Sequence, residues 1–304
     1  MKHNTYKHTT TICIPAYNEE GNLLHLLTDI SAQTQKTFKI TKILVISDGS
    51  TDATVAIAKS FHSNHTIEVV ALPNRQGKAA VQNYAFSHTH TDSLVVLDAD
   101  VRLYDQLFVE KLLKPIISGS AGLTSAQVME IPPTNTFQAI LEASMLLKKE
   151  LFAEFKVGDN VHTCHGRARG FSKSLYSQLQ FPVSASEDAY SYLYCKQTQL
   201  QYVYAHNAHV YYTLPQTFSD HLHQSLRYFD HDAQIGSYFP LETVQREYYL
   251  PFGLAAKHLF ATIAKKPGYI LGYAAVVFAC KMYSLFSRDH LHLWKVAVSS
   301  KRTQ

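Results

Sequence analysis

The sequence is poor in charged residues and in cysteines. Asp, Glu, Lys and Arg make up 17% of the 304 residues, against roughly 25% in typical globular proteins, while 46% are hydrophobic. This composition excludes an intrinsically disordered chain, which would need high charge and low hydrophobicity. The four cysteines are scattered, form no CxxC pair and indicate a reducing compartment. The first ten residues lack the apolar core of a signal peptide, so we expect a cytoplasmic protein body.

Positive charge is scarce over most of the chain. The formal net charge is +4, which is too small to predict nucleic-acid binding. Residues 1–240 carry 19 basic and 21 acidic side chains, whereas residues 241–304 carry 9 basic and 3 acidic ones. The excess positive charge therefore belongs to the last fifth of the chain, and nucleic acid is not an expected partner.

Strand-like and helix-like segments alternate in the first half of the chain. Short runs of β-branched and aliphatic residues are each followed by apolar residues at helical spacing. This alternation predicts an α/β fold with a mostly parallel central sheet flanked by helices, which binds ligands at the carboxyl ends of its strands. The predicted strands are 9–15, 40–47, 66–72, 93–98 and 123–131, and the predicted helices are 21–33, 51–61, 77–88, 105–118 and 136–155.

The second half of the chain has a different pattern. Residues 160–212 are mixed and rich in tyrosine, with a short helix expected near residue 187. From residue 216 onward nearly everything has helical periodicity, interrupted by three prolines. The sequence shows neither an internal repeat nor a low-complexity linker. We therefore expect an α/β domain over residues 1–235 and a helical, basic C-terminal region over residues 236–304.

Two aspartates directly follow the fourth predicted strand. If the extended conformation continues through Asp98-Ala99-Asp100, the two-residue period points both carboxylates the same way. Adjacent carboxylates repel each other unless a cation neutralises them, and a hard divalent metal that also holds a diphosphate suits such a pair. A single D-x-D sequence is more often a solvated acidic turn, so the prediction depends on the other motifs.

Four further motifs accompany this aspartate pair. Residues 14–20 (IPAYNEE) and 47–52 (SDGSTD) end the first two predicted strands, residues 76–83 (QGKAAVQN) open the third helix, and residues 186–188 (SED) lie further on. In this order, the motifs resemble those of the family 2 glycosyltransferases, inverting enzymes with the GT-A fold of nucleotide-diphospho-sugar transferases. The resemblance covers roughly residues 9–230. As a set the motifs are highly specific, although each alone would be weak.

The resemblance implies a nucleotide-sugar site. Pro15, Tyr17 and Glu19 match the first nucleotide-contacting loop of the family. Asp48 matches the acid that family members use on the uracil ring, and Lys78 matches a loop near the diphosphate or sugar. The alternatives are a packing aromatic for Tyr17, a turn-former for Asp48 and a solvated lysine for Lys78.

The same resemblance assigns the metal ligands and the general base. Asp98 would contact both the nucleotide sugar and the metal, and Asp100 the metal, with Mg2+ or Mn2+ as the ion. Asp188 matches the base that takes the acceptor hydroxyl proton while the oxygen attacks the anomeric carbon. Glu187 is the alternative base, and both acids also suit the start of a helix.

Residues 224–228 (QSLRY) resemble the Q-x-x-R-W motif of the membrane-associated family branch that makes cellulose and poly-N-acetylglucosamine. There the Gln and Arg meet the diphosphate and acceptor, so the resemblance assigns Gln224, Arg227 and Tyr228 to the catalytic site. Tyr228 stands where the motif has tryptophan, which leaves acceptor identity and processivity open. The alternative is a surface arginine on an amphipathic helix.

A mostly apolar run occupies residues 268–280, and its extension to residue 286 includes Lys281. The uncharged run is shorter than the about 20 residues of a membrane-spanning helix. Basic residues flank it on both sides, which disfavours a single crossing under the positive-inside rule. The pattern predicts an interfacial or re-entrant segment at the cytoplasmic face of a membrane. A buried core helix and a true span are the alternatives.

Together these features predict an inverting glycosyltransferase. It would move a sugar from a UDP-sugar to a hydroxyl of a saccharide or lipid-linked acceptor, using a divalent metal and an aspartate base. The alternatives are a processive polysaccharide synthase, which would need several membrane-spanning helices, and a catalytically idle nucleotide-sugar-binding protein, which the intact motifs disfavour. The sequence leaves the donor sugar, the acceptor and the oligomeric state open.

Overall fold

The computed structural model describes residues 8–182, 186–229 and 235–286, with the backbone alone for residues 227–229. By its contacts the chain divides into two compact units. The first comprises Met1–Met129 and Thr163–Tyr212, and the second Glu130–His162 and Thr213–Gln304. This division differs from the expected boundary between residues 235 and 236, which stays a prediction.

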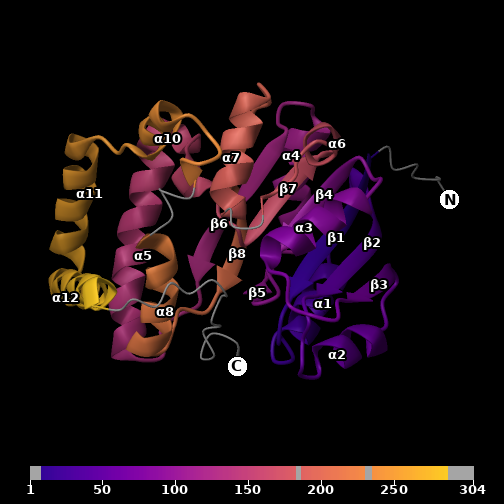
Figure 1. Ribbon diagram of the computed structural model, residues 1–304, viewed down its shortest axis with the longest axis horizontal. Coiled ribbons are helices and arrows are strands. Elements are labelled where there is room, and N and C mark those ends of the chain that lie inside the picture. The colour runs from indigo at the N-terminus through magenta and orange to yellow at the C-terminus, as the bar shows by residue number, and fades with distance from the viewer. Residues whose placement is uncertain (1–7, 183–185, 230–234, 287–304) are drawn as a thin grey trace. The chain divides into compact units, whose positions relative to one another are not determined.

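The first unit is built around the parallel strands that the sequence predicts (Figure 1). Strand β1 (His8–Ala16) pairs on one side with β2 (Phe38–Ser47) and on the other with β4 (Ser93–Leu97). Strand β3 (Thr66–Ala71) pairs with β2, and all three pairings are parallel. Every residue of β4 is buried, because helices cover both faces of such a sheet.

The rest of the sheet is mixed. Strand β7 (Ala168–Ser172) lies between β4 and β6 (Leu123–Glu130) and is antiparallel to both. Strand β8 (Tyr202–Tyr212) pairs antiparallel with the two-residue strand β5 (Val101–Arg102). Periodicity did not predict β5, β7 or β8, because their arginines, glycine and tyrosines are unlike a buried aliphatic run. Among the described residues the sheet has eight strands, in the order β3-β2-β1-β4-β7-β6-β8-β5.

Apolar periodicity explains the helices of the first unit. In α1 (Leu23–Ser31) the buried positions are Leu23, Leu26, Leu27 and Ile30, one face of a helix. Each such burial contributes roughly 2 kcal/mol. The other helices of this unit are α2 (Thr54–Ser60), α3 (Lys78–Ser87), α4 (Phe108–Ile117), α6 (Lys173–Tyr176) and α7 (Glu187–Gln197).

The second unit consists of helices, as predicted. Its helix α5 (Thr136–Glu154) is capped by Asn135, whose side chain accepts a hydrogen bond from the Gln138 amide. Figure 1 shows α8, α11 and α12 beside α5. The remaining elements are α8 (Phe218–Phe229), α10 (Leu241–Tyr248), α11 (Phe252–Lys265) and α12 (Pro267–Phe286), with the short 3-10 helices η1 (Phe155–Gly158) and η2 (Val161–Thr163).

Prolines set the starts of three C-terminal helices. Pro240 and Pro251 immediately precede α10 and α11, and Pro267 is the first residue of α12. Proline suits these positions because its ring fixes φ and the first helical residues need no amide donor. Helix α12 has 20 residues and is long and apolar enough to cross a membrane by length and composition. The helix is therefore longer than the uncharged run read from the sequence.

We expect Gly49→Ala to lower stability more than Gly119→Ala does. Both glycines have positive φ, 71° and 75°, so an alanine at either costs about 1 kcal/mol in backbone strain. At position 49 the added Cβ would also lie 2.7 Å from the Arg75 amide nitrogen, whereas at position 119 it meets nothing within 4 Å. The clash should cost roughly a further 1–3 kcal/mol. Urea unfolding of both variants measures the difference, and equal losses would contradict the close approach.

Candidate functional site

The loops that follow β1 and β2 form one hydrogen-bonded structure. The Asn18 amide donates to Ser50 Oγ at 3.1 Å, and Asn18 Oδ1 accepts from the Thr51 amide at 2.8 Å. The Glu19 amide donates to Thr54 Oγ1 at 2.7 Å. Because β1 and β2 are parallel neighbours, their carboxyl ends and the two motifs meet at one edge of the sheet.

Two acids of these loops serve the start of α2. The Glu20 amide donates to Asp52 Oδ2 at 3.1 Å, and the Ala53 amide donates to Glu20 Oε2 at 3.0 Å. Asp52 Oδ1 accepts from the Thr54 amide at 3.0 Å. Carboxylates at a helix N-terminus satisfy its free amides and its dipole. These two motif residues therefore have a structural role.

Asp48 joins the end of β2 to the start of α3. The buried carboxylate accepts hydrogen bonds from the Gln76 amide at 2.6 Å and the Gly77 amide at 2.9 Å. Gly77 has a φ of 93° and directly precedes Lys78. Asp48 thus fixes the backbone from which Lys78 extends. A further contact of Asp48 with a nucleotide base stays a prediction.

The predicted nucleotide residues of the first loop lie at the carboxyl end of β1. Pro15 is the next-to-last residue of this strand, and Glu19 Oε2 accepts from Asn22 Nδ2 at 2.9 Å. The guanidinium carbon of Arg75 lies 4.1 Å from the centroid of the Tyr17 ring, a cation–π contact. Arg75 was not predicted, since a single arginine in a loop carries no pattern. The nucleotide contacts of Pro15, Tyr17 and Glu19 stay predictions.

Lys78 is the centre of the site. Its Nζ lies 2.6 Å from Asp98 Oδ1 and 2.9 Å from Glu187 Oε1, and it donates to the Gly166 carbonyl at 3.2 Å. Lys78 is the first residue of α3, where the helix dipole disfavours a cation. Burial lowers the pKa of Lys78, but the two carboxylates outweigh burial and hold the pKa above its ordinary value. The ammonium therefore stays charged, neutralised by acids of this chain.

Asp98 and Asp100 lie in a turn between β4 and β5. The expected continuation of the strand through both residues is wrong, because β4 ends at Leu97 and residues 99–100 form a turn. The carboxylates are still close enough to interact. Burial raises the pKa of Asp98 and the charge of Asp100 adds to this, while Lys78 opposes both. Among the residues that the structure describes, the Asp100 carboxylate has no hydrogen-bond or ion-pair partner.

These two acids could supply part of a metal site. In the described part of the chain, no three His, Cys, Asp or Glu side chains are grouped so as to hold a metal ion. Asp98 and Asp100 provide oxygen ligands of the type Mg2+ and Mn2+ prefer, and Mg2+ usually takes only one or two carboxylates besides phosphates and water. The donor set therefore fits an ion whose other ligands come from the substrate.

Asp188 and Glu187 open α7 beside Lys78. Asp188 Oδ1 accepts hydrogen bonds from Ser186 Oγ and, at 2.8 Å, from the Ala189 amide. Its other oxygen faces Gly166, where an added Cβ would lie 3.7 Å from Asp188 Oδ2 and 3.2 Å from Lys78 Nζ. Glu187 is buried, whereas Asp188 is half-buried. The structure thus brings together Lys78, Asp98 and the acidic pair.

Arg169 holds the acidic pair in place, and the sequence analysis missed it. This fully buried residue of β7 donates from Nη1 to the Glu187 carbonyl at 2.6 Å and to Ser191 Oγ at 2.5 Å. Its Nη2 donates to Gln82 Oε1 at 3.0 Å. One guanidinium therefore joins β7, α7 and α3. A buried arginine in a five-residue strand has no periodic signal.

The Q-x-x-R residues belong to the second unit. Gln224, Arg227 and Tyr228 lie on α8. The Gln224 side chain is half-buried, while the side chains of Arg227 and Tyr228 lie outside the described residues. Catalytic roles for the three stay predictions.

The fold is of the GT-A type, and an acid at one of its strand ends shares Lys78 with an acidic helix start. Residues 11–180 match the model of the family described as glycosyl transferase family 2. The match covers more than half of the chain. The chain therefore belongs to glycosyl transferase family 2.

Individual proteins show how far the similarity extends. A 4,4'-diaponeurosporenoate glycosyltransferase of Staphylococcus aureus is 31% identical over 153 residues, which are 49% of this chain and 40% of that protein. The mannosyltransferase PcManGT of Pyrobaculum calidifontis, solved with GDP-Man and Mn2+, has a TM-score of 0.65 and 17% identity, covering 94% of this chain and 89% of that one. The glucosyl-3-phosphoglycerate synthase of Mycobacterium tuberculosis, solved with Mn2+, UDP-glucose and phosphoglyceric acid, has a TM-score of 0.46 and 20% identity, covering 68% and 69%. At 17% identity, the similarity to PcManGT shows the fold of this chain alone.

We expect Arg169→Met to lower both stability and activity. The change leaves Gln82 Oε1 without its donor and removes the guanidinium's hydrogen bonds to the Glu187 carbonyl and Ser191 Oγ, which should cost about 2 kcal/mol or more. The control Tyr176→Phe removes one hydrogen bond, from the Tyr176 hydroxyl to the Thr91 carbonyl. It should cost about 1 kcal/mol and leave kcat unchanged. Urea unfolding and steady-state kinetics measure both variants, and a normal kcat in a folded Arg169→Met enzyme would contradict the positioning role.

Proposed function

We propose that the protein transfers a sugar, with inversion, from a UDP-sugar to a hydroxyl of a saccharide or lipid-linked acceptor. The observation that carries this proposal is the contact of one ammonium, Lys78 Nζ, with both Asp98 and Glu187. Asp98 belongs to the strand end where a diphosphate would bind, and Glu187 to the helix start that carries the candidate base. Donor and acceptor machinery thus share one charged centre.

On the donor side, Asp98 and Asp100 would hold Mg2+ or Mn2+. Asp100 suits this role because its carboxylate has no protein partner among the described residues. When bound, the ion would stabilise the negative charge of the leaving diphosphate. The charge of Lys78 opposes the protonation of Asp98, and Lys78 would lie beside the diphosphate. Pro15, Tyr17, Glu19 and Asp48 would contact the nucleotide.

On the acceptor side, Asp188 suits the general base better than Glu187. Glu187 is buried and its Oε1 is paired with Lys78, whereas Asp188 is half-buried and its Oδ2 lies beside Gly166. In the proposed step the acceptor hydroxyl gives its proton to Asp188 as its oxygen bonds to the anomeric carbon. The bond from that carbon to the diphosphate oxygen breaks on the opposite face, and UDP leaves.

Gln224, Arg227 and Tyr228 remain in the proposal as diphosphate and acceptor contacts of a membrane-associated family branch. Residues 1–235 would form the catalytic domain and residues 236–304 a helical region at the cytoplasmic face of a membrane. Within the described residues one helix, α12, is long and apolar enough to span a membrane. The alternative is a processive synthase, which would extrude its product through several such helices.

The nucleotide is tested directly by comparing UDP-sugars with GDP-sugars. UDP-sugars would release UDP in a reaction that depends on Mn2+ or Mg2+. GDP-sugars serve as the comparison because PcManGT was solved with GDP-Man. Release of GDP alone would reject UDP as the nucleotide. Binding of a UDP-sugar without hydrolysis or transfer to any acceptor would indicate a catalytically idle protein.

We expect Asp188→Asn to lower kcat by about 10²–10⁴-fold, because an amide cannot accept the hydroxyl proton. Binding of UDP should stay nearly unchanged, since the base contacts the acceptor and not the nucleotide. Glu242→Gln is the matched control, since Glu242 is an exposed carboxylate in the first turn of α10. Steady-state kinetics and UDP titration separate these effects, and wild-type-like turnover in Asp188→Asn would reject the assignment.

Removal of a metal ligand should weaken nucleotide binding only when metal is present. We expect Asp100→Asn to lower the affinity for UDP in Mn2+ by about tenfold. This fold-change corresponds to roughly 1.4 kcal/mol, the loss expected when one charge-assisted metal contact is removed. In EDTA the variant and the wild type should bind UDP equally. Calorimetric titration measures both conditions, and a wild-type affinity that does not change with EDTA would contradict the metal site.

A further inference from the structure

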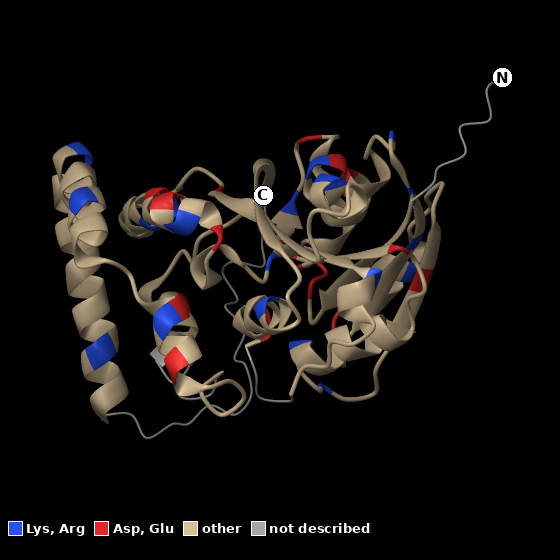
Figure 2. Ribbon diagram, turned by 90° about the horizontal axis from the view of Figure 1, so that it is seen from above, with Lys and Arg blue, Asp and Glu red and all other residues tan. Residues whose placement is uncertain are grey.

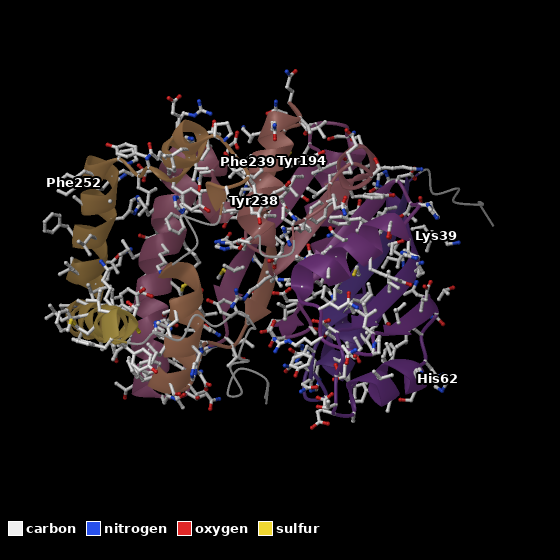
Figure 3. The ribbon with its side chains drawn as sticks, viewed as in Figure 1. Lys39, His62, Tyr194, Tyr238, Phe239 and Phe252 are labelled. Carbon is white, nitrogen blue, oxygen red and sulfur yellow. The ribbon has the colours of Figure 1, made fainter. Side chains whose placement is uncertain are left out.

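Helix α11 has its polarity reversed relative to a helix on the surface of a water-soluble protein. Its buried residues are the polar His258 and Thr262, and its exposed residues include Phe252, Phe260 and Ile263. Phe252 is 84% exposed and projects from the first turn of the helix (Figure 3). A helix bathed in water normally buries its apolar face. The reversal indicates that the outer side of α11 has an apolar neighbour.

The basic side chains of α11, and that of Lys266 between α11 and α12, are paired with acidic side chains of α5. Each basic side chain has a glutamate of α5 as its partner, so the outward surface keeps few charges. Figure 2 shows basic but no acidic residues on α11 and α12. The pairs are Lys257 with Glu154 (2.7 Å), His258 with Glu154 (2.8 Å), Lys265 with Glu150 (3.2 Å) and Lys266 with Glu142 (2.6 Å).

Helix α12 continues this apolar surface. Only Ile270 and Cys280 of its 20 residues are buried. Gly272 fixes the inner side of the helix, since a Cβ there would lie 3.0 Å from Ile140 Cδ1 of α5. The outer side therefore cannot turn inward to bury its large side chains. These exposed residues are Tyr269, Leu271, Phe278, Tyr283, Leu285 and Phe286.

We propose that the outer faces of α11 and α12 lie in the interface of a lipid bilayer that contains anionic lipid. Exposed tyrosines suit this depth, because their rings are apolar and their hydroxyls reach water. The sequence here is complementary to anionic headgroups, since residues 241–304 carry 9 basic and 3 acidic side chains, and Lys281 of α12 is exposed. We call these outer faces of α11 and α12 the bilayer face.

The contacts with α5 favour an interfacial position over a membrane span. Helix α12 packs on α5 through Gly272 and through a hydrogen bond from Lys148 to the Tyr273 hydroxyl at 3.1 Å. A spanning α12 would take the ion pairs of α5 into the hydrocarbon core, where charged groups are costly. An interfacial α12 keeps α5 in water while its own outer side meets lipid. This inference does not depend on the proposed chemistry of transfer.

Sedimentation of the full-length protein with vesicles tests the bilayer face. We expect binding to phosphatidylcholine vesicles that contain phosphatidylglycerol, and weaker binding to phosphatidylcholine alone. Leu271→Glu and Phe260→Glu should each lower the partition coefficient about tenfold, because each replaces a large apolar side chain by a charge. Leu24→Glu is the matched control, since Leu24 is an exposed leucine of α1, in the first unit, and its variant should bind as the wild type does.

Two further measurements make the result decisive. Circular dichroism should show that the glutamate variants fold as the wild type does, since their side chains are exposed. Light scattering without lipid tests a second copy of the chain as the partner of this face. Failure of the wild type to bind either vesicle, or undiminished binding of Leu271→Glu, would overturn the proposal. So would a dimer that Leu271→Glu dissociates without any change in vesicle binding.

Discussion

The site depends on the ion pairs of Lys78 with Asp98 and Glu187. Each partner belongs to a different element: the start of α3, the end of β4 and the start of α7. Without the ammonium, mutually repelling carboxylates would lie in a largely buried space, and without the carboxylates a buried cation would oppose the dipole of its own helix. Asp48 fixes the start of α3 by accepting a hydrogen bond from the Gly77 amide. Arg169 fixes the start of α7 by donating a hydrogen bond to the Glu187 carbonyl. The chemistry of the site is therefore set by how three element ends meet.

The family motifs divide into residues that build the site and residues that we propose to contact a substrate. Asn18, Glu20 and Asp52 hydrogen-bond between two loops and the start of α2, so they hold the loops in register. The Asp100 carboxylate has no hydrogen-bond or ion-pair partner among the described residues, and Asp188 Oδ2 lies beside Gly166, and these are the two acids that we propose for the chemistry of transfer. A motif can thus be specific for a family because its members contact each other.

Helix α11 of the second unit follows a different rule of burial. The first unit buries aliphatic strands and the apolar face of α1, as a protein in water does. In α11 the buried residues are polar and the exposed ones apolar, while its lysines pair with glutamates of α5. One chain therefore contains two kinds of surface.

The sequence by itself determined the family, the parallel strands, the helices and the strand-end acids, because apolar periodicity and short motifs are local properties. The family resemblance placed Lys78 in a loop near the diphosphate or sugar, and the dipole of α3 requires an anion beside a cation at its start. Tertiary structure alone decided that this anion is Asp98 with Glu187, that Arg169 braces α7, and that β7 lies antiparallel between β4 and β6. These features join residues about 20 to more than 100 positions apart, and pairing over such distances depends on how the whole sheet folds. Tertiary structure also decided which side of α12 is exposed. The helix is apolar along nearly its whole length, so only its packing on α5 selects the side that faces out.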